Sequence, residues 1–298
     1  MFDAVPKDLT ARLHQLLDRL EVLLPSGESS LVSAPDWAAS AAFRYRRHAT
    51  GLLGGRGLLQ AVKHIASISY DDLQGIDTQK ARFARNLAQF VAGRPANNVL
   101  LSGARGTGKS SLIRAGLSAH QAQGLRLIEV DKTDLMDLPD LVDLVSQRPE
   151  RFLVFCDDLS FDEGESSYKA LKSILDGTVS AQGDNVLIVA TSNRRHLLPE
   201  YHSDNKGYTH TADGELHPGE VVEEKISLSE RFGLWLSFYP FTQDEYLSIV
   251  SQWLAHFGLD ETAQQAARPE ALIWAIERGS RSGRIAYQFA KDHAGGQA

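Results

Sequence analysis

The sequence contains a single cysteine, Cys156, among 298 residues. One cysteine excludes an internal disulfide framework and is typical of proteins in a reducing compartment. No run of about 18 consecutive apolar residues is present, so we expect no membrane-spanning helix and no membrane partner. The opening "MFDAVPKDLT" lacks the basic region and apolar core of a secretion signal. These absences together predict a cytoplasmic protein.

An excess of positive charge is also missing. The 31 lysines and arginines are outnumbered by 38 aspartates and glutamates, which gives a net charge of -7. A dedicated nucleic-acid binder is usually more basic, so nucleic acid is a less favoured partner and would require a local basic patch. The hydrophobic share of 43% is that of an ordinary globular protein with a sizeable core.

Helical periodicity dominates both ends of the chain. Leucines recur on one helical face over residues 8–24, and residues 35–67 read as two helical pieces. We therefore expect an N-terminal helical module over residues 1–68. Three helical stretches after residue 241 predict a C-terminal helical unit over residues 241–298.

Between these ends, residues 69–240 alternate short apolar runs with helical stretches. The apolar runs are rich in Val, Ile, Leu and Phe, as are strands buried on both faces of a parallel sheet. The helices between them supply the crossover connections. We predict an α/β domain, an αβα sandwich with a five-stranded parallel sheet. Its strands should fall within 98–103, 125–131, 152–158, 185–193 and 233–239.

The stretch "SGARGTGKSS" follows the first apolar run and contains the pattern G-x-x-x-x-G-K-S. Its glycines let backbone N–H groups turn inward, where the positive end of the following helix also attracts anions. Lys109 supplies a mobile charge for nucleotide β- and γ-phosphates, and the Ser110 hydroxyl is a hard ligand for Mg²⁺. The pattern predicts a phosphate-binding loop. Its residues are Gly103, Ala104, Arg105, Gly106, Thr107, Gly108, Lys109, Ser110 and Ser111.

Two carboxylates, Asp157 and Asp158, end the apolar run "FLVFCDD". Phosphoryl transfer needs a carboxylate at a neighbouring strand end to hold the Mg²⁺ shell, and we assign this role to Asp157. Asp158 is the candidate general base that orients an attacking water. Glu163 and Glu165 in the next loop are alternative bases, although a solvated acidic loop is favoured there. A plainer alternative for the aspartates is that they end a strand and cap a helix.

These motifs resemble those of an AAA+ ATPase, and more narrowly a bacterial group of predicted AAA+ ATPases of undefined biological role. The resemblance covers about residues 69–292 and includes "FCDDLSF", "VATSNRRHLLPE", "EEKISLSERFGLWLSFYPF" and "SGRIAYQFA". It implies the AAA+ type of P-loop NTPase fold with a C-terminal helical lid. It also implies ATP and Mg²⁺ as cofactors and a homo-oligomer, such as a hexameric ring, that acts on an unknown protein client.

The resemblance assigns two roles near the γ-phosphate. Asn193 matches the polar sensor that helps to place the attacking water; alternatively, it is a turn-forming asparagine. Arg231 matches the arginine finger, which reaches the nucleotide of a neighbouring subunit and neutralises charge on the transferring phosphoryl group. A surface salt bridge with Glu230 is the alternative for that arginine.

Two further roles concern the lid and the base of the nucleotide. Arg284 matches the second sensor arginine on the lid, with Arg281 as a near alternative three residues earlier. Gly75 and Ile76 match the segment that packs against adenine, for which an apolar pocket is suited. An ordinary turn with a core isoleucine is the alternative for this pair.

Two polar segments fall outside these motifs. The segment 199–226 is expected to be a partner-contact loop, and its histidines lack the tight spacing of zinc ligands. A basic cluster interleaved with aromatics is favoured as a solvated helix face or an intersubunit patch over a nucleic-acid contact. The histidines are His202, His210 and His217, and the basic residues are Arg44, Arg46, Arg47, His48 and Arg56.

The sequence thus predicts an ATP-hydrolysing AAA+ protein that couples nucleotide state to remodelling or loading of an unknown partner. Many AAA+ proteins have glutamate where this chain has Asp158, and aspartate is one methylene shorter. A nucleotide-gated binding module with negligible hydrolysis is therefore an alternative. A small-molecule P-loop kinase is less favoured, because the sequence reveals no acceptor pocket.

Overall fold

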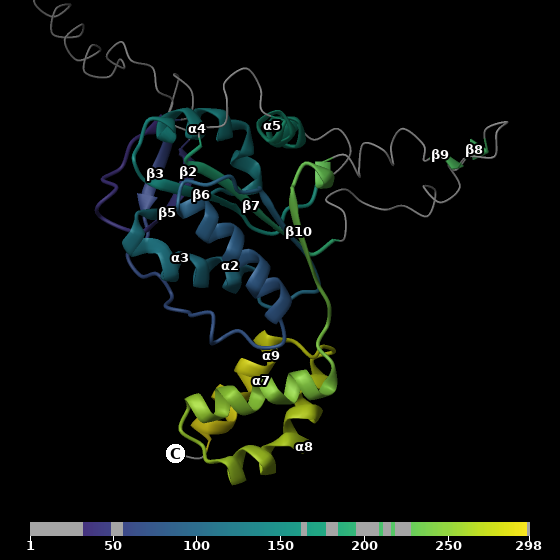
Figure 1. Ribbon diagram of the computed structural model, residues 1–298. Coiled ribbons are helices and arrows are strands. Elements are labelled where there is room, and N and C mark those ends of the chain that lie inside the picture. The colour runs from purple at the N-terminus through teal and green to yellow at the C-terminus, as the bar shows by residue number, and fades with distance from the viewer. Residues whose placement is uncertain are drawn as a thin grey trace, which may run out of the picture.

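The computed structural model describes residues 32–48, 56–161, 166–176, 184–194, 209–210, 216–217 and 228–296. Within these ranges helices cover both faces of an eight-stranded sheet, and three C-terminal helices form a bundle beside it (Figure 1). None of the helices in these ranges has the length and apolar character needed to cross a membrane. The mixed α/β class predicted from the sequence is confirmed.

The strands follow the order β1-β3-β2-β5-β6-β7-β4-β10 across the sheet. The last five run parallel to one another and coincide with the five predicted strand segments. Their carboxyl ends lie along one edge of the sheet, which is where open parallel sheets bind ligands. These strands are β5 (Leu125–Glu129), β6 (Arg151–Cys156), β7 (Val186–Ser192), β4 (Val99–Gly103) and β10 (Leu234–Phe238).

The predicted count of five strands is wrong, because three strands extend the sheet beyond β5. β2 (Ala42–His48) pairs with β5 in parallel, β3 (Arg56–Ala61) pairs with β2 antiparallel, and β1 (Val32–Ser33) pairs with β3 in parallel. Two of the three extra strands therefore run against the other six. The predicted sandwich therefore corresponds to the five parallel strands from β5 to β10 and the helices that flank them.

The predicted helical module is also wrong where the structure describes it, since β2 and β3 lie within residues 35–67. Phe43 and Tyr45 are buried, whereas Arg44 between them is partly exposed. A period of two is that of a strand with one buried face, not that of a helix. The predicted helix over residues 8–24 lies outside the described residues.

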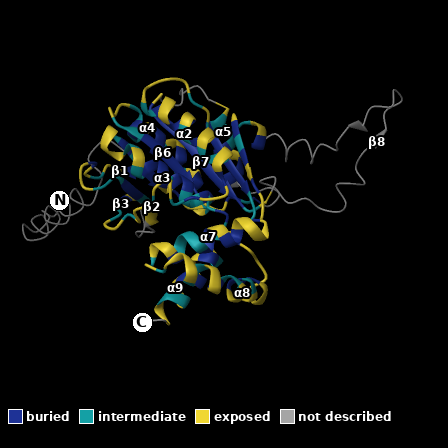
Figure 2. Ribbon diagram, turned by 60° about the horizontal axis from the view of Figure 1, so that its bottom comes forward, coloured by how far each residue is buried: buried dark blue, intermediate teal, exposed yellow. Residues whose placement is uncertain are grey.

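Two hydrophobic cores lie on the two faces of the sheet. Helices α2 (Asp77–Val91) and α3 (Lys109–His120) cover one face, and α4 (Leu138–Ser146) and α5 (Ser166–Leu175) cover the other. Leu101 packs in the first core and its neighbour Leu100 in the second, as the alternation of a pleated strand requires. Figure 2 shows the resulting pattern, with buried strands inside and helices exposed on their outer sides. Cys156, fully buried, belongs to the second core.

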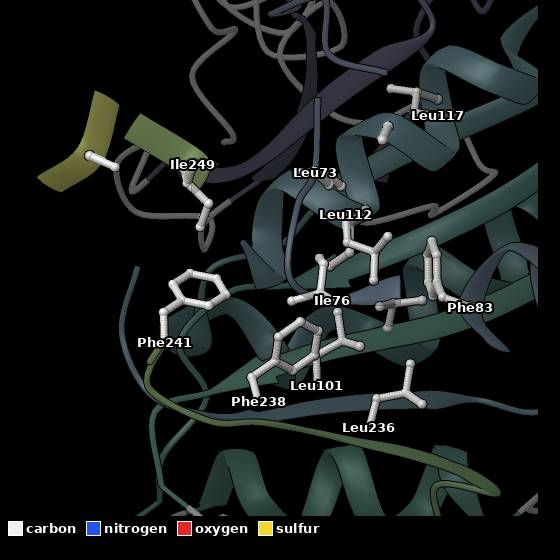
Figure 3. Packing of buried hydrophobic residues seen from close by; sticks show 14 of the residues in the cluster. Leu73, Ile76, Phe83, Leu101, Leu112, Leu117, Leu236, Phe238, Phe241 and Ile249 are labelled. Carbon is white, nitrogen blue, oxygen red and sulfur yellow. The ribbon is translucent and has the colours of Figure 1, made fainter. Parts of the chain in front are cut away.

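The C-terminal bundle consists of α7 (Gln243–His256), α8 (Glu261–Glu277) and α9 (Gly283–Gly295). Helix α7 begins with a capping box, in which the Thr242 hydroxyl accepts from the Glu245 amide and the Glu245 carboxylate accepts from the Thr242 amide. Ile249 of α7 and Phe241 just before it belong to the first core together with Ile76 (Figure 3). The bundle and the sheet therefore share one apolar core.

Short elements complete the described chain. The 3₁₀ turns η2 (Gln121–Gln123) and η3 (Lys132–Asp137) precede β5 and α4. The two-residue strands β8 (Thr209–His210) and β9 (Leu216–His217) pair antiparallel within the polar segment 199–226.

Candidate functional site

A glycine-rich loop connects β4 to α3 at the carboxyl edge of the sheet. Gly103, Gly106 and Gly108 have φ angles of +124°, +72° and +97°, which side chains rarely adopt. A Cβ on Gly103 would lie 2.0 Å from the Phe238 carbonyl oxygen, so only glycine fits there. The loop is anchored to β10, because the Ala104 amide donates to that same carbonyl at 3.0 Å. The sequence pattern therefore corresponds to a sharply bent backbone.

The loop delivers the chain into the N-terminus of α3, with Gly108 as the N-cap. Glycine has no side chain to accept hydrogen bonds from the first amides of the helix. Those amides and the positive end of the helix dipole remain directed at the loop, an arrangement that binds anions.

Lys109, the first residue of α3, is only 7% exposed. Its ammonium donates to the carbonyl oxygens of Gly103 and Ala104 at 2.8 and 2.7 Å, and to Asn193 Oδ1 at 3.1 Å. Burial lowers the pKa of Lys109, and the nearby carboxylates of Asp158 and Asp157 oppose that shift. The contacts bring together the loop lysine and the predicted polar sensor.

Ser110 and Asp157, the predicted metal pair, are in contact. The Ser110 hydroxyl donates to Asp157 Oδ1 at 2.9 Å, and the Thr191 hydroxyl donates to the same oxygen at 2.5 Å. A hydroxyl and a carboxylate at one point are the hard oxygen ligands that suit Mg²⁺.

Asp158 has a φ of +52°, and it is the only non-glycine residue with positive φ in the described part of the chain. A left-handed conformation is uncommon outside glycine, although aspartate adopts it more readily than most residues. The Asp158 amide donates to Thr191 Oγ1 at 2.8 Å, and its carboxylate accepts from Asn193 Nδ2 at 2.5 Å. The structure thus places the candidate base beside the candidate sensor. The alternative bases, Glu163 and Glu165, lie outside the described residues.

Thr191 is a site residue that sequence reasoning missed. It is 1% exposed and lies two positions before Asn193. Alternation along a strand puts residues two apart on the same face, so the string "ATSN" contained the signal. What the sequence could not give was the adjacency of β6 and β7, which brings Thr191 to Asp157.

The start of α9 contacts the loop directly. The Gly283 amide donates to the Gly106 carbonyl at 2.9 Å. A Cβ on Gly106 would lie 2.7 Å from Ser282 Oγ and 3.5 Å from Arg284 Cβ. Burial is the main cause of the lowered pKa of Lys109, and the positive charge of Arg284 is among the lesser causes. Both arginines are exposed, but Arg284 lies in the first turn of α9 and borders the loop, whereas Arg281 precedes the helix.

Gly75 and Ile76 lie on the apolar side of the loop. A Cβ on Gly108 would lie 3.6 Å from Ile76 Cδ1 and 3.9 Å from Leu73 Cδ2, and one on Gly75 would lie 3.0 Å from Phe241 Cε1. Ile76 is 4% exposed and belongs to the first core. An apolar wall therefore lines the loop where the resemblance puts adenine.

Arg231 precedes β10 and forms an ion pair with Asp176 at the end of α5. The sequence alone gave no indication of this partner. The pair belongs to the α5 side of the sheet, while the loop and α3 belong to the α2 side. None of the contacts described above links Arg231 to the loop residues.

The structure describes the whole basic cluster but only four residues of the segment 199–226. The basic cluster lies on β2 and β3, so the expected helix face is wrong, and its arginines are partly paired. Arg44 contacts Glu129 at 2.8 Å and Arg47 contacts Asp137 at 3.7 Å. Of the three histidines, His202 lies outside the described residues, and His210 and His217 lie in β8 and β9. The described residues contain no group of three or more metal-ligating side chains.

Solved structures of AAA+ proteins share this fold. The Thermotoga maritima RuvB Holliday junction branch migration motor is 19% identical with a TM-score of 0.51, over 76% of this chain and 64% of that chain. The FIGL-1 AAA domain in complex with ADP is 19% identical with a TM-score of 0.50, over 77% and 74%. This chain thus spans just under two thirds of the RuvB structure, and at these identities the likeness concerns the fold.

No curated protein sequence matches the chain. A family model described as "Protein of unknown function (DUF815)" matches residues 38–297, which include every described element from β2 to α9. The glycine-rich loop, the paired aspartates and the α9 contact all lie within that match. This chain therefore belongs to the DUF815 family, and its fold is the one that the solved AAA+ structures share.

Proposed function

We propose that the protein binds ATP with Mg²⁺ and hydrolyses it to ADP and phosphate. The supporting observation is a convergence at one edge of the sheet. A glycine loop with positive φ angles, the N-terminus of α3, an ammonium group, and a contacting hydroxyl and carboxylate all meet there. Each group suits one part of a magnesium triphosphate.

In this proposal the loop amides and Lys109 hold the phosphates. The ammonium now contacts two loop carbonyls, and a phosphate would replace those acceptors with a stronger, charged one. Ser110 and Asp157 would hold Mg²⁺, which when bound supplies positive charge against the phosphate oxygens. Ile76 and its apolar neighbours would pack against the base.

Asp158 would accept a proton from the attacking water, and Asn193 would hold its carboxylate in place through the 2.5 Å contact. The shorter reach of aspartate favours slow turnover. The same feature supports a second candidate function, a nucleotide-gated binding module with negligible hydrolysis.

The remaining roles concern coupling. We propose that residues 241–298 act as a lid, because the start of α9 contacts Gly106. Arg284 would sense the phosphates from that lid, and Arg231 would act as a finger in a neighbouring subunit of a ring. A protein client is favoured over nucleic acid, since the arginines of β2 are partly paired with acids. The free, buried Cys156 is consistent with a cytoplasmic location.

The test is ATP binding and phosphate release by the full chain and by Lys109→Ala, with the exposed Lys291→Ala on α9 as a matched control. We expect Lys109→Ala to lose measurable binding and turnover, and Lys291→Ala to retain both. Unchanged affinity in a folded Lys109→Ala variant would refute the loop assignment. Tight ATP binding without phosphate release by the unmodified chain would favour the binding module.

A further inference from the structure

The chain segment that leaves β6 remains hydrogen-bonded to the last residues of β7. The Leu159 amide donates to the Thr191 carbonyl at 2.7 Å, and the Ser192 hydroxyl donates to the Leu159 carbonyl at 2.7 Å. With the Asn193 contact to Asp158, these bonds fix Asp158 and Leu159 to the end of β7 and to Asn193 just after it. The two acidic residues are therefore positioned from the neighbouring strand.

Thr191 occupies the centre of this region. Its hydroxyl donates its one proton to Asp157 Oδ1 at 2.5 Å and accepts from the Asp158 amide at 2.8 Å. A hydroxyl has one donor and two acceptor lone pairs, so one group serves both neighbours. Thr191 is 1% exposed, so water cannot readily replace it.

The two bonds have different consequences. The bond to Asp157 turns Oδ1 toward Thr191 and Ser110, which orients the whole carboxylate. The bond from the Asp158 amide holds a backbone with φ of +52°, a conformation that is uncommon outside glycine, although aspartate adopts it more often than most residues. That backbone aims the Asp158 side chain at Asn193. One hydroxyl thus determines the direction of both carboxylates.

We propose that Thr191 is a positioning residue that couples the magnesium-binding carboxylate to the candidate general base. The proposal rests on the proposed function, because it takes Asp157 as a Mg²⁺ ligand and Asp158 as the base. It adds that the Mg²⁺ dependence of nucleotide binding and the rate of hydrolysis depend on the same hydroxyl group.

The test compares Thr191→Val, which replaces the hydroxyl with a methyl group of similar size, with Thr191→Ser, which retains it. Ser192→Ala is a matched control, since Ser192 is equally buried on the same strand and its hydroxyl serves the main chain. The measurements are the affinity for the slowly hydrolysed analogue ATPγS with Mg²⁺ and with EDTA, the kcat for ATP, and the melting temperature.

We expect Thr191→Val to bind ATPγS in EDTA as tightly as the unmodified chain does. The increase in affinity that Mg²⁺ produces should be smaller in Thr191→Val by roughly tenfold or more. Its kcat should fall by roughly 10- to 100-fold, a loss like that from removing one charge-assisted hydrogen bond. Thr191→Ser should restore both. Ser192→Ala should lower the melting temperature and leave the Mg²⁺ effect intact.

Three outcomes would overturn the proposal. One is a folded Thr191→Val variant with the normal Mg²⁺ effect, and another is equal impairment of Thr191→Ser. The third is a loss of the Mg²⁺ effect in Ser192→Ala, which would indicate general loosening of the strands.

The same measurements separate this proposal from the proposed function. If the unmodified chain binds ATPγS but does not hydrolyse ATP, only the hydrolysis proposal fails, and the Mg²⁺ effect still tests the role of Thr191. If it binds no nucleotide, both proposals fail.

Discussion

Gly106→Ala tests whether the contact between the loop and α9 matters for nucleotide binding. An alanine at φ of +72° costs about 1–2 kcal/mol. Its Cβ would lie 2.7 Å from Ser282 Oγ and 2.9 Å from Ser282 Cβ, well inside the normal contact distance of about 3.5 Å. Moving Ser282 away breaks the bond from the Gly283 amide, which is worth about 1 kcal/mol.

These costs sum to about 2–3 kcal/mol, and an empty loop can relax to avoid most of them. Nucleotide binding must restore the bent loop, so the cost should appear in the affinity. Isothermal titration calorimetry of Gly106→Ala should therefore show an ATP dissociation constant raised roughly 30- to 150-fold. The C-terminal helices should also protect the loop less in hydrogen exchange.

The control is Gly124→Ala. Gly124 has a φ of +89°, and a Cβ there would meet no atom within 4 Å. This variant carries the backbone strain without a steric clash, so it should lose stability and keep its ATP affinity. In Gly106→Ala/Ser282→Gly the clash is relieved at little capping cost, so part of the affinity should return. A folded Gly106→Ala variant that binds ATP as tightly as the unmodified chain would refute this reasoning.

Four shorter predictions accompany this one. Asp158→Asn should keep ATP binding and lose phosphate release, and equal turnover would move the base to another residue. Arg231→Ala should be inactive alone and regain activity when mixed with Lys109→Ala, because site and finger would then meet across subunits; mixtures without activity would contradict a finger in trans. Thr242→Ala should cost about 1 kcal/mol of unfolding free energy, measured by urea denaturation, through loss of the α7 cap. Partial burial, then two neighbouring aspartates, raise the pKa of Asp134 on folding, so its charge opposes folding above that pKa. Asp134→Asn should thus raise the melting temperature at pH 7, with a gain that shrinks as pH falls through the folded pKa.

The parallel strands β4, β6 and β7 were predictable because they are buried on both faces. An apolar run such as "FLVFC" predicts a buried element of the core. The loop between β4 and α3 contains a pattern whose glycines are each required by the backbone. The AAA+ fold expected from these motifs is confirmed by the solved structures that share it.

The first strands were not recognised because their composition obscures their period. In β2, Ala42 and Phe43 are both buried, which breaks the alternation, and the arginines that follow are common in helices. In β3, Gly57 and Leu59 face inward while Leu58 is 42% exposed, so apolar residues occur on both faces. Only pairing with β5 determines which face is buried, and pairing is not local information.

The site was predictable to the extent that its groups follow strands or glycines. The contacts of Lys109 with Asn193, and of Ser110 with Asp157, join residues that the motifs had singled out. Thr191 and the Asp176 partner of Arg231 escaped notice because each depends on two segments that meet only in the folded chain. The catalytic roles of all these residues stay predictions until the variants are measured.

The burial of Cys156 has a practical consequence. The thiol is 0% exposed, and burial raises its pKa to about 12, so maleimides and disulfide reagents should not modify it in the folded protein. No background substitution is then needed before dyes or spin labels are attached elsewhere. Cysteines introduced at the exposed positions Tyr239 and Ile276 would report the separation between the sheet and the C-terminal helices in a fluorescence transfer experiment.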